Sequence, residues 1–283
     1  MFLRFCQQHK LVSVPASDDT LLLFITYLHN RSLSFNTIKV YLSSIITLHN
    51  MLGSVPPNKK NPRIKLALRA ISLKSPEPSQ KDPITFKVLL SIWQVIDRLP
   101  EYRCIKAAIA LGFFGGLRGA EYLRAKFNPG PAIHQVKFNV GQSNVMTYRV
   151  LKSKTKPHGF TLPLACSKHD ICAVCCMTNY LQHRQSCSHM NDSDPLFMYQ
   201  GLELTKCKLS AILKDLLLSI GLLPTQYSLH SLRSGVATTA ANCNFKDWEL
   251  KMLGGWESNT YMSYIRPTNT ARTTFPRRLV NVK

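Results

Sequence analysis

Ten residues from Lys74 to Pro83 constrain the fold most, because they divide the chain into two parts. Three prolines fall here among Ser, Glu, Gln and Lys. Proline removes a backbone donor and breaks helices, and a polar stretch of this kind has no apolar side chains with which to form a core. A length of 283 residues leaves room for two domains of ordinary size. We therefore predict a linker over 74–83, a first domain over 1–73 and a second over 84–283.

Residues 1–73 show the periodicity of amphipathic helices. Two sets of apolar residues recur three and four positions apart: Leu21, Phe24, Ile25 and Leu28, then Ile38, Tyr41, Leu42, Ile45 and Leu48. Ser34 and Asn36 stand where helix N-caps are expected, and a third helix is predicted from Ile64 to Leu73. The first domain is thus predicted to be small and all-helical, with an incomplete first helix near Met1.

Residues 84–283 combine helical patterns with one stretch of period two. Helical patterns cover 85–99 and 103–126, and the second is interrupted by Gly112, Gly115, Gly116 and Gly119. Further helices are predicted near 172–185, 205–220, 229–242, 246–253 and 259–265. From His134 to Leu164 apolar residues alternate around two turns, Gly141 to Asn144 and Pro157 to Gly159, which predicts a three-stranded antiparallel meander. The fold class is therefore mainly α, with one small sheet in the second domain.

The charge of the chain predicts a polyanionic partner. Lys and Arg number 36 against 15 Asp and Glu, a net charge of +21, and the pI is near 9.8. Both predicted domains carry the basic excess, which favours contact with a long polyanion such as duplex DNA. A basic protein that binds nucleic acid without specificity is the alternative that charge alone leaves open.

The apolar runs are too short for a signal peptide or a membrane span. The longest near the start is Leu21 to Ile25. We therefore expect an intracellular protein without membrane contact, located in the nucleus if its host is eukaryotic. Nine cysteines in such a protein predict reduced thiols.

Arg118 and Glu121 form the first chemical motif, within Gly115-Gly116-Leu117-Arg118-Gly119-Ala120-Glu121. Residues three apart share a face of a helical turn, so the carboxylate can hold the guanidinium in a fixed pose. A surface salt bridge is the alternative. The glycines do not form a dinucleotide-binding motif, because a helix and not a strand is predicted before them.

His230 and Arg233 form the second motif. They share a face at the predicted start of a helix, with Ser228 as its expected N-cap. An imidazole and a guanidinium at a helix N-terminus provide an anion site. A core or capping histidine beside a solvated arginine is the alternative.

The third motif runs from Leu253 to Arg266. It contains a Gly-Gly helix stop, Trp256, an expected N-cap at Ser258, and two tyrosines, Tyr261 and Tyr264. A tyrosine on a helix face is usually structural. A phenol becomes a nucleophile only beside a base or a field of positive charge.

These motifs in this order resemble the tyrosine recombinase or phage integrase family, whose pattern is an Arg in Gly-Leu-Arg-x-x-Glu, then His-x-x-Arg, then His or Trp, then a nucleophilic Tyr. The helical first domain resembles that family's core-binding domain. The Ser153-Lys154-Thr155 segment and the ending from Gly254 to Pro267 look most like recombinases of DIRS and Ngaro type retrotransposons.

The resemblance implies a role for each matching residue. Arg118 and Arg233 would hold the scissile phosphate, Glu121 would orient Arg118, and His230 and Trp256 would donate to phosphate or attacking oxygens. The nucleophile would be Tyr264, eight residues beyond Trp256, whereas Tyr261 would pack. The general acid would be Lys154, with Lys152 and Lys156 as competitors.

The reaction so implied is site-specific DNA recombination through a 3′-phosphotyrosine intermediate, without metal, cofactor or ATP, in the integration of a mobile element. A homotetramer on paired DNA sites is implied too, with the tail around Arg272, Arg277 and Arg278 passed to a neighbour.

In the first domain Lys39, Lys65 and Arg69 are predicted to contact DNA, as are Lys152 and Lys156 in the second. The alternatives are a catalytically silent DNA-binding protein derived from such an element and a type IB topoisomerase.

The acidic, cysteine and histidine residues are the candidates for metal binding. No dense Asp and Glu cluster suited to two Mg²⁺ ions is apparent in the sequence. A zinc site is a hypothesis for the cysteines and histidines between 166 and 189, because Cys172 and Cys175 have ligand spacing; the candidates are Cys166, Cys172, Cys175, Cys176, Cys187, His169, His183 and His189. A second pair is missing, however, and Cys176 falls within a predicted helix. Zinc binding and buried thiols both remain open, and we favour thiols.

Overall fold

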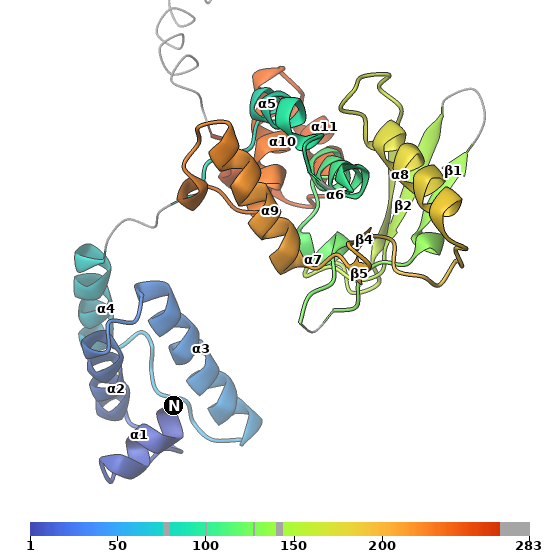
Figure 1. The fold of residues 1–283 in the computed structure, drawn as a ribbon. Helices are drawn as coiled ribbons and strands as arrows, with labels where there is room; N and C mark the ends of the chain where they lie inside the picture. Colours follow the sequence, from blue (N-terminus) through green and yellow to red (C-terminus); the bar gives the residue numbers. More distant parts are fainter. Residues whose placement is uncertain (76–79, 100, 127, 140–143, 267–283) are drawn as a thin grey trace, which may run out of the picture. The chain divides into compact units, whose positions relative to one another are not determined.

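The computed structural model describes residues 1–75, 80–99, 101–126, 128–139 and 144–266. The chain forms two compact units, Met1–Ser79 and Gln80–Lys283 (Figure 1). Most of the predicted turn Gly141 to Asn144, and the predicted tail arginines Arg272, Arg277 and Arg278, lie outside the described residues.

The first unit consists of helices α1 (Phe2–Gln8), α2 (Asp18–Asn30), α3 (Phe35–Met51) and α4 (Pro62–Lys74). Side chains at three N-caps accept backbone N–H groups: Ser17, Ser34 and Asn61. Ser34 is therefore the N-cap of α3, as predicted, whereas Asn36, which was also predicted to be an N-cap, lies inside that helix.

The apolar stripes of these helices meet in one core. It contains Phe24 and Ile25 of α2, Ile38 of α3 and Ile64 of α4. His49 is buried in the same unit. Its Nε2 accepts the Ala16 N–H at 2.9 Å, and its Nδ1 lies 2.8 Å from the Ile45 carbonyl oxygen. Burial of this imidazole is thus matched by hydrogen bonds to both nitrogens.

The second unit is mostly helical. Its α-helices are α5 (Phe86–Ile96), α6 (Tyr102–Phe114), α7 (Gly119–Tyr122), α8 (Ala173–Cys187), α9 (Lys206–Ser219), α10 (His230–Asn242) and α11 (Asp247–Gly254), and its 3-10 turns are η1 (Ile133–Gln135), η2 (Pro224–Gln226) and η3 (Asn259–Tyr264). Helix α6 is apolar on almost every side and runs through the core.

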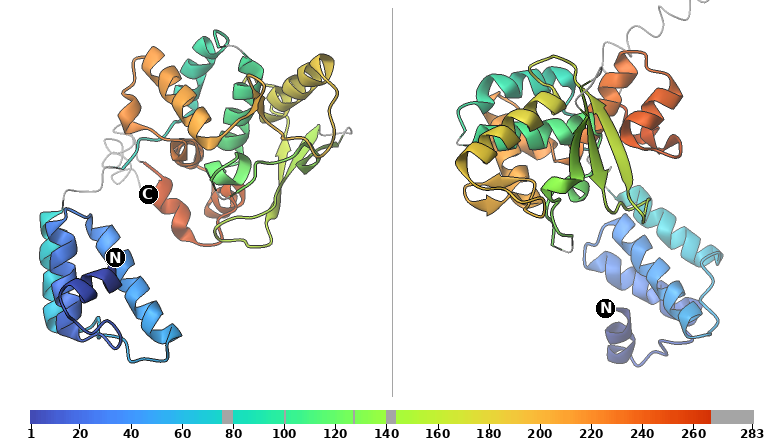
Figure 2. Two further views of the ribbon diagram at one scale, coloured as in Figure 1. Left: turned by 60° about the horizontal axis from the view of Figure 1, so that its bottom comes forward. Right: turned by 90° about the vertical axis from the view of Figure 1, so that its right-hand side faces the viewer.

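One three-stranded antiparallel sheet completes the second unit, in the order β1 (Val136–Asn139), β2 (Val145–Val150) and β3 (Phe160–Ala165). Val136 pairs with Tyr148, and Val150 pairs with Phe160. Helix α8 lies along one face of this sheet (Figures 1 and 2). The predicted fold class, mainly α with one small antiparallel meander, is confirmed.

Two local predictions were wrong, and one short hairpin was missed. The helix predicted over 103–126 ends at Phe114, because Gly116 adopts a left-handed φ of 53° that turns the chain toward α7. The segment predicted as a helix over 259–265 is a 3-10 turn. A hairpin of two-residue strands, β4 (Met198–Tyr199) and β5 (Leu202–Glu203), was not predicted, because strands this short show no periodicity.

The end of the predicted linker is bound to the second unit. Lys81 Nζ donates to the Thr225 carbonyl, and the Asp82 N–H donates to the carbonyl of Gln226. The Ile84 N–H donates to the Ser231 carbonyl at 2.8 Å, beside the start of α10. Residues 81–84 are therefore hydrogen-bonded to η2 and to the first turn of α10.

Within the described residues, no helix has both the length and the apolar character that a membrane span requires.

Candidate active site

Arg118 is held by Glu121 at the turn between α6 and α7. One Glu121 oxygen accepts the Arg118 backbone N–H at 2.7 Å, and the other accepts its guanidinium at 2.9 Å. The same carboxylate accepts the Ser153 hydroxyl at 2.8 Å. Because the Glu121 side chain is only 4% exposed and that of Arg118 is 26% exposed, this is a positioned pair with one open side, and not the surface salt bridge of the alternative.

Arg233 is the most deeply buried charge of the site, at 2% exposure. Its guanidinium donates to the Gly116 carbonyl, and its Cζ lies 4.4 Å from the centre of the Trp256 ring. A guanidinium on an indole face is a favourable cation–π pair. Removal from water, followed by the positive charge of Arg118, lowers the pKa of Arg233. Arg118 and Arg233 therefore together raise the positive electrostatic potential of the candidate active site.

Tyr264 lies against the residues of the second and third motifs. Its ring centre is 5.1 Å from that of His230 and 5.6 Å from that of Trp256. The Arg233 Cζ is 5.4 Å from the same ring. The structure thus brings together side chains from the turn before α7, the first two turns of α10 and the segment after α11.

A small apolar cluster positions Tyr264. Trp256 and Tyr261 pack with Ala237 and Ala240 of α10 and Leu250 of α11. Tyr261 is 1% exposed, so it packs, as the resemblance implies for it. The Ser258 side chain accepts the Thr260 N–H, which makes Ser258 the N-cap of η3 as predicted.

One detail of the predicted site differs in the structure, whereas the role of Trp256 stays a prediction. Ser228 is not the N-cap of α10, because Leu229 occupies that position; the Ser228 N–H instead donates to Ser231 Oγ at 3.0 Å. The Trp256 indole presents its face to Arg233, and its buried Nε1 has no hydrogen-bond partner among the described residues.

The three candidate lysines follow β2 and differ in their surroundings. Lys152 and Lys154 are exposed. The Lys156 Nζ lies 3.4 Å from a Glu257 carboxylate oxygen and 5.2 Å from the centre of the Phe160 ring. Lys156 is therefore the lysine that the structure brings to the turn containing Trp256, whereas Lys154 is exposed on the connection between β2 and β3.

The predicted DNA contacts of the first unit lie on its surface. Lys39 is exposed on α3, and Lys65 and Arg69 are exposed on α4. Their exposure leaves them accessible to phosphates, and their contact with DNA stays a prediction.

Sequence reasoning missed the parts played by Ser153 and Gly116. Ser153 joins the connection between β2 and β3 to Glu121, and its only sequence signal is its place beside Lys154. The Gly116 carbonyl accepts from Arg233. A backbone oxygen carries no residue-type signal, so nothing in the sequence indicates this contact.

Replacing Glu121 by alanine should strongly destabilise the second unit. Loss of one partner from a buried ion pair costs about 3–5 kcal/mol, because the other charge loses its compensation. Ser153→Ala removes one hydrogen bond to a charged group and should cost about 1.5–3 kcal/mol. Urea unfolding of the two variants and of the wild-type chain measures both losses of unfolding free energy. If Glu121→Ala loses less than Ser153→Ala, Glu121 is not the group that holds Arg118 and Ser153.

His230 should titrate below its ordinary range in the free protein. Partial removal from water, then the charges of Arg233 and Arg118, lower its pKa. The unfolded chain therefore binds the proton more readily, so this contribution to stability is present above about pH 6.5 and is lost as the pH falls through the lowered pKa. NMR titration, with the ring signal assigned through His230→Gln, checks the shift. A pKa at or above the ordinary value would contradict it.

Comparisons with known proteins assign the fold. No protein-family model matches the chain, and no curated protein matches it. Among solved structures, the chain is similar to the Tn1549 transposon integrase in complex with transposon right end DNA, with 13% identity and a TM-score of 0.61 over 93% of this chain and 85% of that one. It is similar to the XerH site-specific recombinase bound to a palindromic difH substrate, with 16% identity and a TM-score of 0.62 over 94% and 72%.

A lambda integrase dimer bound to a COC' core site is similar as well, with 14% identity and a TM-score of 0.52 over 88% of this chain and 64% of that one. All three structural neighbours are recombinases or integrases bound to DNA. At these identities the likeness concerns architecture and not individual side chains. The chain therefore has the fold of the tyrosine recombinases.

Proposed function

We propose that this chain breaks and rejoins duplex DNA through a covalent bond between Tyr264 and a phosphate. The observation that carries the proposal is the single cluster in which Tyr264 contacts His230 and the stacked Arg233 and Trp256. Two separate parts of the sequence supply these groups, and positive charge beside a phenol is what attack on a phosphodiester requires.

The chemistry follows from the charges of the site. A phosphodiester accumulates negative charge on its oxygens as a nucleophile attacks, and the guanidiniums of Arg118 and Arg233 stabilise that charge. The Tyr264 oxygen forms the new bond to phosphorus, while the bond to the 5′ oxygen breaks. The pKa of His230 is lowered by burial and by the nearby arginines, so its ring can be neutral and take the proton of the phenol, a role that differs from the donation that the resemblance implies. A lysine supplies a proton to the leaving oxygen. Attack by a 5′ hydroxyl reverses these steps, so no ATP is consumed.

A nicked suicide substrate tests the proposal. Cleavage near the nick releases a short fragment that diffuses away, so a covalent intermediate would accumulate as a denaturation-resistant protein–DNA adduct. The assay is run without added metal on a broad pool of element-end sequences. Tight binding without any adduct would favour the rival function, a catalytically silent DNA-binding protein. An adduct with relaxation of supercoils but no exchange between two sites would favour a topoisomerase.

The leaving-group acid can be assigned by sulfur substitution. We predict that Lys154→Ala slows cleavage of ordinary DNA about 10²–10⁴-fold, the usual contribution of a general acid. A bridging 5′ phosphorothiolate needs no such acid, because a thiolate is a good leaving group, so it should restore the rate of this variant. If the phosphorothiolate restores the cleavage rate of Lys156→Ala and not that of Lys154→Ala, the general acid is Lys156. If it restores neither rate, neither lysine is the general acid.

The proposal also includes the class of mobile element that the protein serves and the number of protomers that assemble on DNA. The two segments that resemble DIRS and Ngaro type recombinases support integration of a mobile element of that class. The family resemblance supports a homotetramer on paired sites. Both stay predictions.

A further inference from the structure

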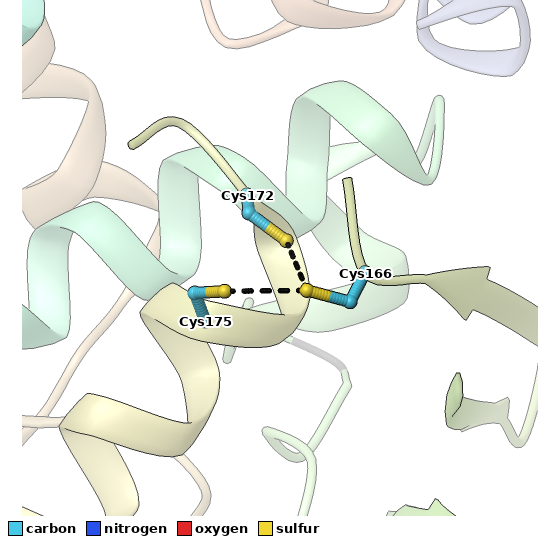
Figure 3. A group of neighbouring side chains, drawn as sticks. All are labelled: Cys166, Cys172 and Cys175. Atoms are coloured by element: carbon cyan, nitrogen blue, oxygen red, sulfur yellow. Dashed lines mark hydrogen bonds between the residues drawn. The ribbon is translucent and has the colours of Figure 1, made fainter. Parts of the chain in front are cut away.

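Three cysteines converge between the sheet and helix α8, apart from the candidate active site. Cys166 follows the last residue of β3, Cys172 is the N-cap of α8, and Cys175 lies in the first turn of that helix. Figure 3 shows the three side chains pointing toward one another from these two elements. All three thiols are free.

The sulfur atoms have the spacing of ligands around one metal ion. Cys166 Sγ lies 3.4 Å from Cys175 Sγ and 3.8 Å from Cys172 Sγ, and all three sulfurs lie within 4.8 Å of one another. Tetrahedral zinc binds thiolates at about 2.3 Å, which places neighbouring sulfurs about 3.8 Å apart. The observed triangle is thus close to one face of a zinc–thiolate tetrahedron without rearrangement of the backbone.

Two features beside Cys172 can stabilise a thiolate ligand. The Ser167 N–H donates to Cys172 Sγ at 3.4 Å, and the N-terminus of the fifteen-residue helix α8 begins at Cys172. Backbone N–H groups and a helix N-terminus both stabilise a thiolate. Three adjacent thiolates repel one another, and a divalent cation removes that repulsion.

We propose that Cys166, Cys172 and Cys175 bind one zinc ion. The fourth ligand is water or an external donor, which can enter through a pocket of about 350 Å³ that Cys166 and Cys175 line together with Thr178. Cys176 does not join the group, because its sulfur faces the Asp170 carbonyl at 3.9 Å. The ion fastens the end of β3 to the start of α8. The proposal thus takes up the zinc alternative in place of the buried thiols that the sequence favours.

Metal analysis of the full chain tests the site. Protein purified under reducing conditions is expected to contain about one equivalent of zinc. Cys166→Ala, Cys172→Ala and Cys175→Ala should each lose most of it, whereas Cys207→Ala, at an exposed cysteine on α9, should keep it. Equal zinc in the variants and in the wild type would overturn the proposal.

Two measurements on the wild-type chain keep the test decisive if a variant does not fold. Replacement by Co²⁺ should give sulfur-to-metal charge-transfer absorption and the intense visible bands of a tetrahedral site. Alkylation followed by mass spectrometry should find these three thiols protected until a chelator is added. No cobalt–thiolate spectrum, or a disulfide between Cys166 and Cys175 in freshly purified, reduced protein, would overturn the metal site.

Discussion

Tyr264→Phe is expected to abolish the covalent protein–DNA adduct completely while leaving DNA affinity unchanged. Phenylalanine keeps the ring that contacts His230 and Trp256 but lacks the oxygen that would bond to phosphorus. Because most affinity for DNA comes from phosphate contacts elsewhere on the protein, one hydroxyl contributes little to it. The measurement is adduct formation on the nicked substrate by denaturing electrophoresis, beside a filter-binding or anisotropy titration.

Tyr261→Phe is the matched control. It makes the same chemical change three residues earlier, at a side chain that is 1% exposed and packed in the small apolar cluster that positions Tyr264. We expect this variant to form the adduct at the wild-type rate. An adduct that survives in Tyr264→Phe and disappears in Tyr261→Phe would make Tyr261 the nucleophile, and survival in both would show that neither tyrosine carries the DNA.

Arg233→Met is expected to slow cleavage about 10³–10⁵-fold, the range for an arginine that stabilises phosphoryl transfer. The same substitution should leave the thermal midpoint unchanged or raise it. Methionine fills much of the volume on the Trp256 face, and removal of this buried cation relieves its desolvation and its repulsion with Arg118, which both lower the Arg233 pKa. The loss would then be chemical and not a consequence of unfolding.

Arg233→Ala and Arg233→Lys complete the experiment. Alanine leaves a cavity under the Trp256 ring and should lower the thermal midpoint. Lysine keeps the charge but cannot reproduce the planar donor that stacks on the indole and reaches the Gly116 carbonyl, so it too should be slow. Calorimetry and single-turnover cleavage measure the two properties separately. Near-normal cleavage by Arg233→Met would exclude Arg233 from the reaction.

Local patterns in the sequence determined most of the secondary structure. The periodic apolar positions of α2 and α3 and the alternation across β1 to β3 depend on neighbours a few residues away, so they can be read without the fold. The same holds for Arg118 and Glu121, which share one turn and meet as predicted. Chemistry that spans three or four residues needs no tertiary information.

The tertiary structure alone decided which distant groups meet. Arg233 reaches the Gly116 carbonyl across 117 residues of sequence, Lys156 and not Lys154 contacts the turn that contains Trp256, and Cys166 joins the Cys172 and Cys175 pair. Such contacts depend on how α6, α10, α11 and the sheet pack, and packing is set by the summed burial of many side chains. No single residue type carries that information, so the sequence predicts the members of the site, and the fold decides their geometry.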